Sequence, residues 1–568
     1  SNKVLVLLDG RSVYVDLLGT VYWGQLPVSL EEIERIEVIR GPGSAIYGAN
    51  AMTGVINIIT LPPEDADDRF KVEGGSPGYA QGSVVTHGTH RSTAYRFSAG
   101  YHQTGRWSAE SLVPEDGPMV VHGADPDLSL QVFRTNARLD HSFMEWGMLS
   151  LSGGYAQGYN EFYALGALGD FVMDFQNSYG RMDVGFGPVH LRTFYSSLVG
   201  ATYPWSSYEG AREVGGTIDN DTIDGELEGY HTFQTGPVDH RVLAGVGVRS
   251  KRIAFAMLEE GGEPISEQHY SAFVQEEARV DPVRMVGSLR VDRHPLVELK
   301  RTVSPRGAAV IRIRPETSMR ASVGTSFRAP SHIESYTDFA LPSTADAVYI
   351  DVLGDRELVP ESVRSFELGL HDESTGWYRA DAAVFLNEVR DLIFVGEKED
   401  TSALSYNPDS NGFSAGEIRF TNLGSEWVGY GLELDGRVFP VDGVELLGNL
   451  NWQRITEDDG DQVLVDASTS ELKLNLGLSY RAPWQMDLSV RGHYVSPQTW
   501  RLREYDEIGN LVDHEESIDA RTIGVARVAS RMLFGSSSEL AVTAWNIAGL
   551  LGAEPFSEHP KGQEVGSR

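Results

Sequence analysis

Long segments in which apolar and polar residues strictly alternate recur through most of this chain. Residues 472–480 place Leu or Tyr at every second position, and residues 486–494 resume the pattern after a short connection. A period of two is that of a β-strand with one apolar and one polar face, and two such segments joined by a short connection predict a β-hairpin. The same pattern recurs at residues 149–155, 319–327 and 444–452. We therefore predict strands from about residue 70 to the end.

The polar positions of these strands carry charged residues, such as Lys473, Asp487 and Arg491. A soluble sandwich also alternates, but it rarely needs strands of about ten residues in long succession. A transmembrane barrel does need them, with apolar side chains toward lipid, polar side chains toward the lumen, and closure that leaves no amide unpaired. A soluble β-propeller or β-helix is the alternative, but we find no repeat of fixed period such as a propeller would give.

The connections between the predicted strands differ in length. The connection at 482–485 is short, whereas those at 338–355, 396–417 and 500–516 are long and polar. Short periplasmic turns and long extracellular loops are typical of outer-membrane barrels. No stretch of about 18 consecutive apolar residues is present, so we predict no transmembrane helix.

Composition excludes several classes of function. The absence of cysteine rules out disulfides, thiolate metal sites and a cysteine nucleophile. The net charge of −34 opposes a nucleic-acid partner, because binding to phosphates requires a basic surface. This charge serves either to solvate exposed loops or to attract cations. The 15 histidines are scattered and no catalytic or metal-binding motif is found, so we expect neither an enzyme nor a cofactor or resident metal.

The first part of the chain predicts a small mixed α/β unit. An apolar strand at 4–8 is followed by a hairpin turn and a second strand at 12–15. Ser29 and Glu32 have the spacing of a capping box, which predicts a short helix to about Arg35.

Three segments of this unit carry a specific motif. Residues 26–28, 33–50 and 54–60 read LPV, IERIEVIRGPGSAIYGAN and GVINIIT, and the sequence Asp-Gly-Arg at 9–11 precedes them. This string closely resembles the plug signature of TonB-dependent outer-membrane receptors. The resemblance covers nearly all of residues 1–62 and implies that they form the C-terminal half of a plug domain.

Shorter segments in the rest of the chain resemble barrel strands of the same family, in the family's order. They are residues 270–277, 304–306, 327–330, 358–361, 366–370, 429–434 and Asn546. The resemblance implies an all-β membrane protein, with a large antiparallel transmembrane β-barrel of the 22-strand type and long extracellular loops over residues 63–568. The small α/β plug of residues 1–62 is expected inside the lumen.

Family members also carry an N-terminal TonB-binding segment, a first plug half and a last strand that ends in an aromatic residue. These features are not found in this sequence. We therefore expect a fragment that lacks the N-terminal plug half and the last strand, with an incomplete barrel.

The resemblance implies TonB-dependent active transport of a scarce ligand across the cell outer membrane. The ligand class expected is a ferric siderophore or a similar metal chelate, with cobalamin or oligosaccharide uptake as alternatives. The implied partners are the TonB energy-transducing complex, acting through the missing segment, and outer-membrane lipid and lipopolysaccharide. Two other interpretations stay open: a passive or signalling barrel that binds a surface partner, and a soluble β-rich enzyme.

The resemblance also implies a charge cluster between plug and barrel. By position in the motifs, the plug arginines are Arg11 and Arg40, and the barrel glutamates are Glu367 and Glu433. Such a cluster would hold the plug strongly when complete and weakly when one partner is removed. The alternative is that the arginines are ordinary solvated charges, because isolated ion pairs often contribute little.

A ligand site is expected where the family places a plug loop facing the extracellular vestibule. Tyr22 and Trp23 offer aromatic surface there, and Asp16 and Gln25 offer polar contacts. The alternative is that the two aromatic residues only pack the plug against the barrel wall. Loop residues that could add contacts are Tyr336, Asp338 and Phe339.

Overall fold

The structure of the protein, a computed structural model, describes most of the chain. Among the described residues, no helix combines the length and the hydropathy that crossing a membrane would require. The described residues are 3–76, 78–105, 119–121, 128–144, 146–163, 170–204, 206–208, 216–342, 348–396, 399–407, 412–458, 460, 462–505, 511–531 and 538–547.

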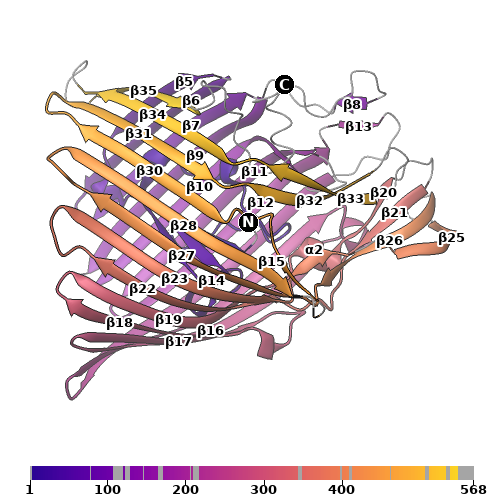
Figure 1. Ribbon diagram of the computed structural model, residues 1–568, viewed down its shortest axis with the longest axis horizontal. Coiled ribbons are helices and arrows are strands. Elements are labelled where there is room, and N and C mark those ends of the chain that lie inside the picture. Colours follow the sequence, from indigo (N-terminus) through magenta and orange to yellow (C-terminus); the bar gives the residue numbers. More distant parts are fainter. Residues whose placement is uncertain are drawn as a thin grey trace.

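A closed antiparallel β-barrel forms the body of the molecule (Figure 1). In the part of the chain that the structure describes, the ring has 22 strands. Of these, β29 is three residues long and pairs with the end of β28, while β28 also pairs with β30. This arrangement confirms the predicted 22-strand type. In order around the ring, the strands are β5 (Arg69–Gly75), β6 (Tyr79–His90), β7 (Thr93–Gly105), β9 (Leu128–Met144), β10 (Gly147–Tyr163), β11 (Asp170–Phe186), β12 (Val189–Pro204), β14 (Gly216–Thr235), β15 (Val238–Phe255), β16 (Ile265–Val280), β17 (Val283–Arg293), β18 (Val303–Arg314), β19 (Thr317–Arg328), β22 (Glu361–Asp372), β23 (Tyr378–Arg390), β27 (Glu426–Val438), β28 (Val444–Asp458), β29 (Val463–Val465), β30 (Leu472–Arg481), β31 (Met486–Val495), β34 (Arg521–Ser530) and β35 (Leu540–Trp545).

The alternating segments have become strands whose apolar faces point outward. The predicted hairpin is confirmed, because β30 pairs antiparallel with β31 and places Leu478 opposite Val490. Both side chains are exposed, as are Leu227 and Val246, which face each other across β14 and β15. A continuous exposed apolar surface on a closed ring is the arrangement that a lipid bilayer requires.

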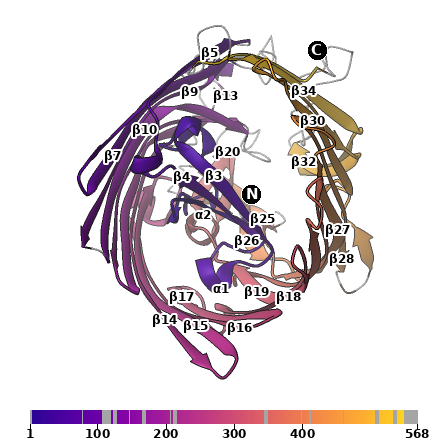
Figure 2. The same cartoon turned by 90° about the vertical axis from the view of Figure 1, so that its left-hand side faces the viewer.

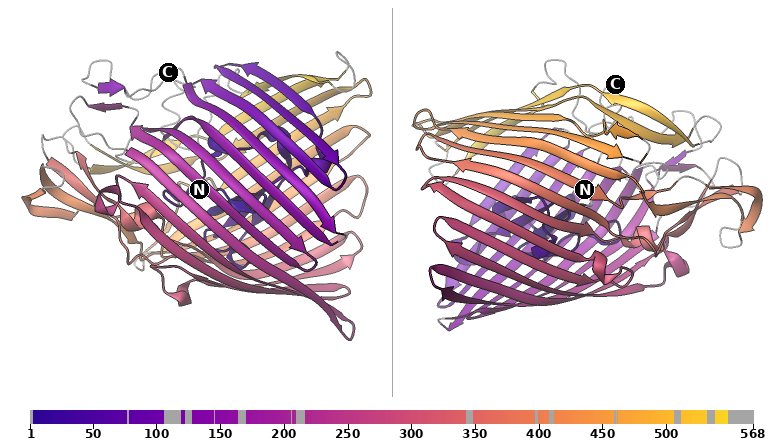
Figure 3. Two further views of the ribbon diagram at one scale, coloured as in Figure 1. Left: turned by 180° about the vertical axis from the view of Figure 1, so that it is seen from behind. Right: turned by 60° about the horizontal axis from the view of Figure 1, so that its bottom comes forward.

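The two ends of the barrel differ. Hairpin turns gather at one end, and longer connections with their own secondary structure project from the other (Figures 1 and 3). By analogy with outer-membrane barrels, the long connections are the extracellular ones. Their elements are β8 (Met119–Val121), β13 (Ser206–Tyr208), η5 (Glu259–Gly262), η6 (Leu299–Arg301), α2 (His332–Tyr336), β20 (Asp338–Pro342), β21 (Val348–Leu353), β24 (Ile393–Val395), β25 (Glu399–Asn407), β26 (Gly412–Asn422), β32 (Gln498–Tyr505) and β33 (Leu511–Ile518).

A small four-stranded sheet lies inside the ring (Figure 2). Its order is β2-β1-β4-β3, with β1 parallel to β4 and the other pairs antiparallel. Val6 and Leu8 belong to one apolar cluster of this unit, and Leu5 and Leu7 to another. The predicted plug inside the lumen is confirmed, while the division between residues 62 and 63 stays a prediction. Its elements are β1 (Val4–Leu8), β2 (Arg11–Ser12), η1 (Trp23–Gln25), η2 (Leu30–Glu32), β3 (Ile33–Arg40), α1 (Ser44–Tyr47), β4 (Gly54–Thr60) and η3 (Pro63–Asp65).

The helix expected to run to about Arg35 is shorter than predicted. The capping box is present, with the Ser29 backbone N–H donating to Glu32 Oε1 at 2.9 Å, but only one turn of 3-10 helix follows. Strand β3 begins directly after it and pairs with β4, where Ile36 lies opposite Ile58. Since β-branched side chains pack well on a sheet, pairing with β4 outweighs the local helix signal.

We expect Val246→Arg to destabilise the barrel by about 2–4 kcal/mol, because the charge would lie near the middle of the outward face of β15. Thr235→Arg, at the turn end of the paired strand β14, should cost about 0–1 kcal/mol, because the charge can reach the interface. Urea unfolding in lipid vesicles measures both. Equal effects of the two substitutions would contradict the assignment of this face to lipid.

Candidate functional site

The plug lies against one side of the barrel wall (Figure 2). In the described part of the chain, the plug makes most of its polar contacts with strands β7 to β22. On the other side of the lumen, Arg40 of the plug contacts Glu433 of β27. The wall residues of β7 to β22 that make these hydrogen bonds and ion pairs with the plug are Arg96, Arg134, Asn136, Gly158, Asn177, Lys251, Arg290, Ser326, Phe327 and Glu361. The interface is therefore rich in hydrogen bonds and ion pairs.

Polar side chains of β9 hold one plug segment by its backbone. Arg134 donates to the carbonyl oxygens of Gly24 (3.2 Å) and Val28 (3.1 Å). Asn136 donates to the carbonyl oxygen of Pro27 (3.1 Å). Because backbone carbonyls are present whatever the side chain, these bonds fix the path of the plug chain.

A buried ion pair joins the plug to β7. Arg96 Nη2 lies 3.3 Å from Glu32 Oε2, and both side chains are 1% exposed. Burial raises the pKa of the Glu32 carboxyl, in spite of the Ser29 backbone bond and the Arg96 charge that favour its ionised form. Removing one partner of such a pair typically costs about 3–5 kcal/mol, because the other charge stays buried and unpaired.

A second buried network ties β19 to an extracellular helix. Arg328 Nε donates to Glu361 at 2.7 Å, and its two Nη atoms donate to Glu334 of α2 at 2.8 and 2.9 Å. Glu334 also closes a capping box with Ser331. Lys3 of the plug lies 3.1 Å from Glu361. The network thus connects the wall, α2 and the plug.

The helix α2 is also bonded directly to the plug. The backbone N–H of His332 donates to the Asp16 carbonyl at 3.2 Å, and that of Ile333 donates to the Leu17 carbonyl at 3.0 Å. The first turn of α2 therefore satisfies its free amides with plug carbonyls. Any displacement of this plug loop must break these bonds or move α2 with it.

The Asp16 side chain faces the wall. Its carboxylate accepts a hydrogen bond from Lys251 Nζ at 2.8 Å. Burial alone would raise the pKa of the Asp16 carboxyl, but the Lys251 and Arg249 charges bring it below its ordinary value. Asp16 is therefore ionised and bound to the wall.

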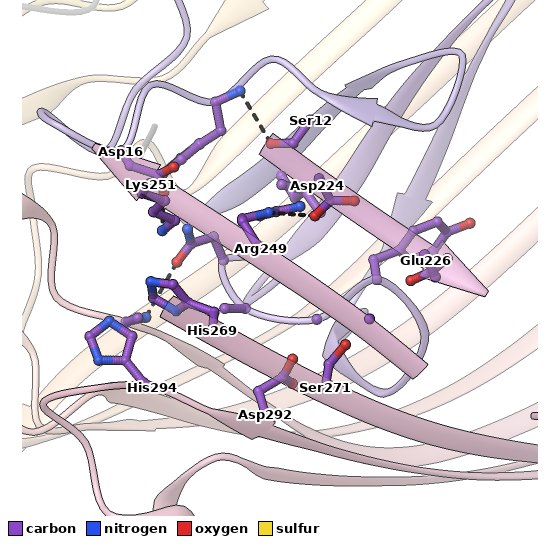
Figure 4. A pocket seen from close by; sticks show the side chains of 18 of the residues that line it. Ser12, Asp16, Asp224, Glu226, Arg249, Lys251, His269, Ser271, Asp292 and His294 are labelled. Carbon is purple, nitrogen blue, oxygen red and sulfur yellow. Dashed lines mark hydrogen bonds and ion pairs between the residues drawn. The ribbon is translucent and has the colours of Figure 1, made fainter. Parts of the chain in front are cut away.

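A cavity of about 130 Å³ adjoins this ion pair (Figure 4). It is small beside the roughly 300–1,000 Å³ of typical ligand pockets, and its charged lining is suited to ordered water. Arg249 Nε donates there to Asp224 at 2.7 Å. Charged lining residues from the wall are Arg192, Asp224, Glu226, Arg249, Lys251, Arg290, Asp292 and Arg293.

The structure brings together one pair of the predicted charge cluster. Arg40 Nη1 contacts Glu433 Oε2. Glu367 instead accepts from Arg320 of the neighbouring strand at 3.0 Å. Arg11 is buried with its guanidinium carbon 4.0 Å from the centre of the Tyr179 ring. In the described contacts Arg40 and Glu433 meet, whereas Arg11 and Glu367 contact other residues. That the four residues together lock the plug in place stays a prediction.

The four predicted ligand-binding residues differ in accessibility. Asp16, Tyr22 and Gln25 are buried, whereas Trp23 is 53% exposed. Tyr22 packs against Phe175 of β11, with ring centres 5.7 Å apart. For Tyr22 this is the alternative considered from the sequence, in which the side chain packs the plug against the wall. Contact of the exposed Trp23 with a ligand stays a prediction. Gln25 Nε2 donates to the Gly158 carbonyl of β10 at 3.0 Å.

The three loop residues that could add contacts also differ in accessibility. Tyr336 is buried and its hydroxyl donates to Glu267 at 2.9 Å. Phe339 is half-buried against the apolar cluster around Tyr22, and Asp338 is exposed.

A histidine cluster at the extracellular end of β16 and β17 was missed by sequence analysis. Glu267, His269 and His294 place donor atoms within 4.8 Å of one another. The residues are separated in the sequence and match no metal motif. One sequence feature could have indicated the cluster. Glu267 and His269 are two residues apart, so they lie on one face of a strand, and His294 directly follows the strand that pairs with it.

Two family models match this chain. The plug domain model of TonB-dependent receptors matches residues 1–55, and the model described as "TonB dependent receptor-like, beta-barrel" matches residues 71–521. The second match covers well over half of the chain, and the fold agrees with both.

Individual proteins agree with this result. The chain is 26% identical over 406 residues to the vitamin B12 transporter BtuB of Vibrio vulnificus, covering 69% of this chain and 60% of that protein. It is 26% identical over 433 residues to the iron-regulated outer membrane virulence protein of Vibrio cholerae, covering 69% and 59%. The chain thus matches about 60% of the length of these curated relatives.

A solved structure with the same fold is the siderophore receptor PirA from Acinetobacter baumannii. The TM-score is 0.72 at 14% identity, over 94% of this chain and 85% of that one. The family consists of receptors of the bacterial outer membrane and not of enzymes. On the two family matches and the plugged barrel, this chain belongs to the TonB-dependent receptor family.

Proposed function

We propose that the protein carries a scarce ligand, too large for a porin, across the outer membrane by TonB-dependent active transport. The observation that supports this most is a plug inside a closed barrel, held by polar contacts. A pore blocked in this way does not pass solutes until the plug moves, so work must be supplied. TonB is the proposed partner that supplies it.

The polar character of the plug interface suits such a movement. The ion pairs and hydrogen bonds of the interface can exchange their partners for water when the plug is pulled. The apolar cluster that joins Val15, Leu17 and Tyr22 of the plug to the wall would be exposed by the same movement and would oppose it. The charged cavity beside Asp16 and Lys251 offers a place where water can enter first. The buried Arg96–Glu32 pair would resist displacement most, since its charges lie farthest from solvent.

The proposed ligand is a ferric siderophore or a similar metal chelate. Support comes from the names of the relatives, which include an iron-regulated outer-membrane protein and a siderophore receptor. Cobalamin is the second candidate, because a vitamin B12 transporter is also among them. The exposed Trp23 of the plug offers a flat aromatic surface that suits ligands of either kind.

A strain that lacks this gene should lose growth on one iron chelate supplied as the sole iron source, or on cobalamin in a strain that requires it. The complete gene should restore growth only when TonB is present, because opening of the plugged barrel needs work. The measurement is growth on a panel of chelates and cobalamin, with and without TonB. Growth that is independent of TonB would instead favour the passive barrel.

Trp23→Ala should weaken binding of the growth-supporting ligand about 10-fold, equivalent to ~1.4 kcal/mol, through loss of aromatic contact. Fluorescence titration of the purified receptor measures the Kd. The control is Trp484→Ala, because Trp484 is equally exposed, at 54%, but follows β30 in a short turn at the other end of the barrel. An unchanged Kd for Trp23→Ala would remove this residue from the ligand site.

We propose that Arg40 and Glu433 help to hold the plug in place. Because the two side chains are 50% and 21% exposed, a double-mutant cycle should give a coupling energy of only about 0.5–1 kcal/mol. Arg40→Ala and Glu433→Ala should each increase entry of a large antibiotic that the intact outer membrane excludes.

The matched control for this lock is Arg35→Ala, since Arg35 is also 50% exposed but pairs with Glu34 and Glu37 within the plug. Antibiotic sensitivity of cells that carry each variant is the measurement. If Arg35→Ala increases entry as much as Arg40→Ala, the contact with β27 has no special role.

A further inference from the structure

Three imidazoles surround one carboxylate oxygen at the extracellular end of the barrel. The Nε2 atoms of His269, His294 and His332 lie 2.9, 3.8 and 3.7 Å from Glu267 Oε2. Glu267, His294 and His332 are buried. Neutral imidazole and carboxylate are the donors that Zn²⁺ and similar divalent ions bind in proteins.

The four residues come from three elements. Glu267 and His269 lie on β16, His294 follows β17, and His332 begins α2. Figure 4 shows His269 and His294 beside each other at the edge of the charged cavity. Their rings are 4.7 Å apart and nearly perpendicular, which leaves their edges free to converge on a common point.

The spacing is close to that of a metal site. Bonds of about 2.0–2.1 Å in a tetrahedron place neighbouring ligand atoms about 3.3 Å apart. The distances of 2.9, 3.7 and 3.8 Å from Glu267 Oε2 to the three imidazoles bracket this value. The donor atoms of Glu267, His269 and His294 all lie within 4.8 Å of one another. Side-chain rotations that bring these three donors closer by up to about 1.5 Å would place them around one ion, and His332, which lies outside this group of three, would have to move further to join as the fourth ligand.

An unpartnered group points into the cluster. His332 is 3% exposed, and its Nε2 has no hydrogen-bond partner. A buried polar atom without a partner is unfavourable unless something binds it. The 3.7 Å to Glu267 is too long for a hydrogen bond. A metal ion at the centre would satisfy this atom.

The remaining contacts of Glu267 orient it for such a role. The Tyr336 hydroxyl donates to Oε1 at 2.9 Å and leaves Oε2 facing the histidines. The nearby Lys251 ammonium, which would repel a cation, is bonded to Asp16. In His294, Nδ1 accepts a hydrogen bond from the Leu296 N–H at 3.2 Å. Binding of a metal ion through Nε2 would place the ring proton on Nδ1. The Leu296 hydrogen bond would then be lost.

We propose that Glu267, His269 and His294, with His332 as the fourth donor, bind one divalent transition-metal ion of the Zn²⁺ class. Nitrogen donors select such an ion over Ca²⁺ and Mg²⁺, which prefer oxygen ligands. The ion would join β16 and the end of β17 to α2, the helix that is bonded to the plug. This site is independent of the transported ligand and of the proposed transport.

The test uses the full chain, purified in detergent without a polyhistidine tag and stripped of metal. We expect one Co²⁺ per chain, with the intense visible absorption of a four-coordinate site, and displacement by Zn²⁺. His294→Ala and Glu267→Gln should each raise the Kd by more than the ~10–100-fold that follows loss of a group supporting a ligand. Calorimetric titration measures the Kd, and circular dichroism checks the sheet.

The matched control is His240→Ala, because His240 also faces a glutamate, Glu276, at 2.8 Å but lies outside the cluster. Its Kd should equal that of the parent. His332→Gln supplies a variant in a loop helix, outside the wall, and should weaken Co²⁺ binding and change its spectrum. Parent-like binding by folded His294→Ala and His332→Gln, or only the weak spectrum of hydrated Co²⁺ in the parent, would overturn the proposal.

Discussion

The need to pair every backbone amide in a medium without water governs this structure. Lipid offers no hydrogen bonds, so a sheet that crosses it must close on itself. Closure forces one face of every strand outward and the other inward, and the alternating sequence supplies both faces. The same closure creates a lumen wide enough to hold the four-stranded plug sheet.

Within that lumen, the choice of contacts determines what the plug can do. The segment around Pro27 is held by its carbonyls, and Asp16 and Glu32 are held by single cations of the wall. Hydrogen bonds and ion pairs of this kind fix the position of the plug, but each of these polar groups can form a comparable hydrogen bond with water when the plug moves. An apolar cluster also joins the plug to the wall through Val15, Leu17 and Tyr22, and it would have to separate when this loop moves. The polar contacts are the part of the interface that water can replace.

How far the sequence predicts this structure depends on the range of the interactions concerned. Strand alternation is local, and it predicted β30 and β31 correctly. The capping box of Ser29 and Glu32 is local too, but the helix stops after one turn because β4 provides a partner for β3. Motif positions identified Arg40 and Glu433, which meet, and Glu367, which pairs with Arg320 of the adjacent strand. Partner choice depends on distances across the lumen, which no single motif contains. The histidine cluster escaped notice for the same reason, since His332 reaches Glu267 only through the fold.

The backbone bonds from α2 to Asp16 and Leu17 have a consequence for communication across the membrane. Because two backbone amides of α2 donate to carbonyls of this plug loop, the position of α2 depends on whether the loop is in place. Any interaction that stabilises one position of α2 therefore favours the matching position of the plug loop by the same free energy, as linkage requires. The two bonds thus make this loop and α2 a single mechanical unit across the boundary between plug and extracellular connections.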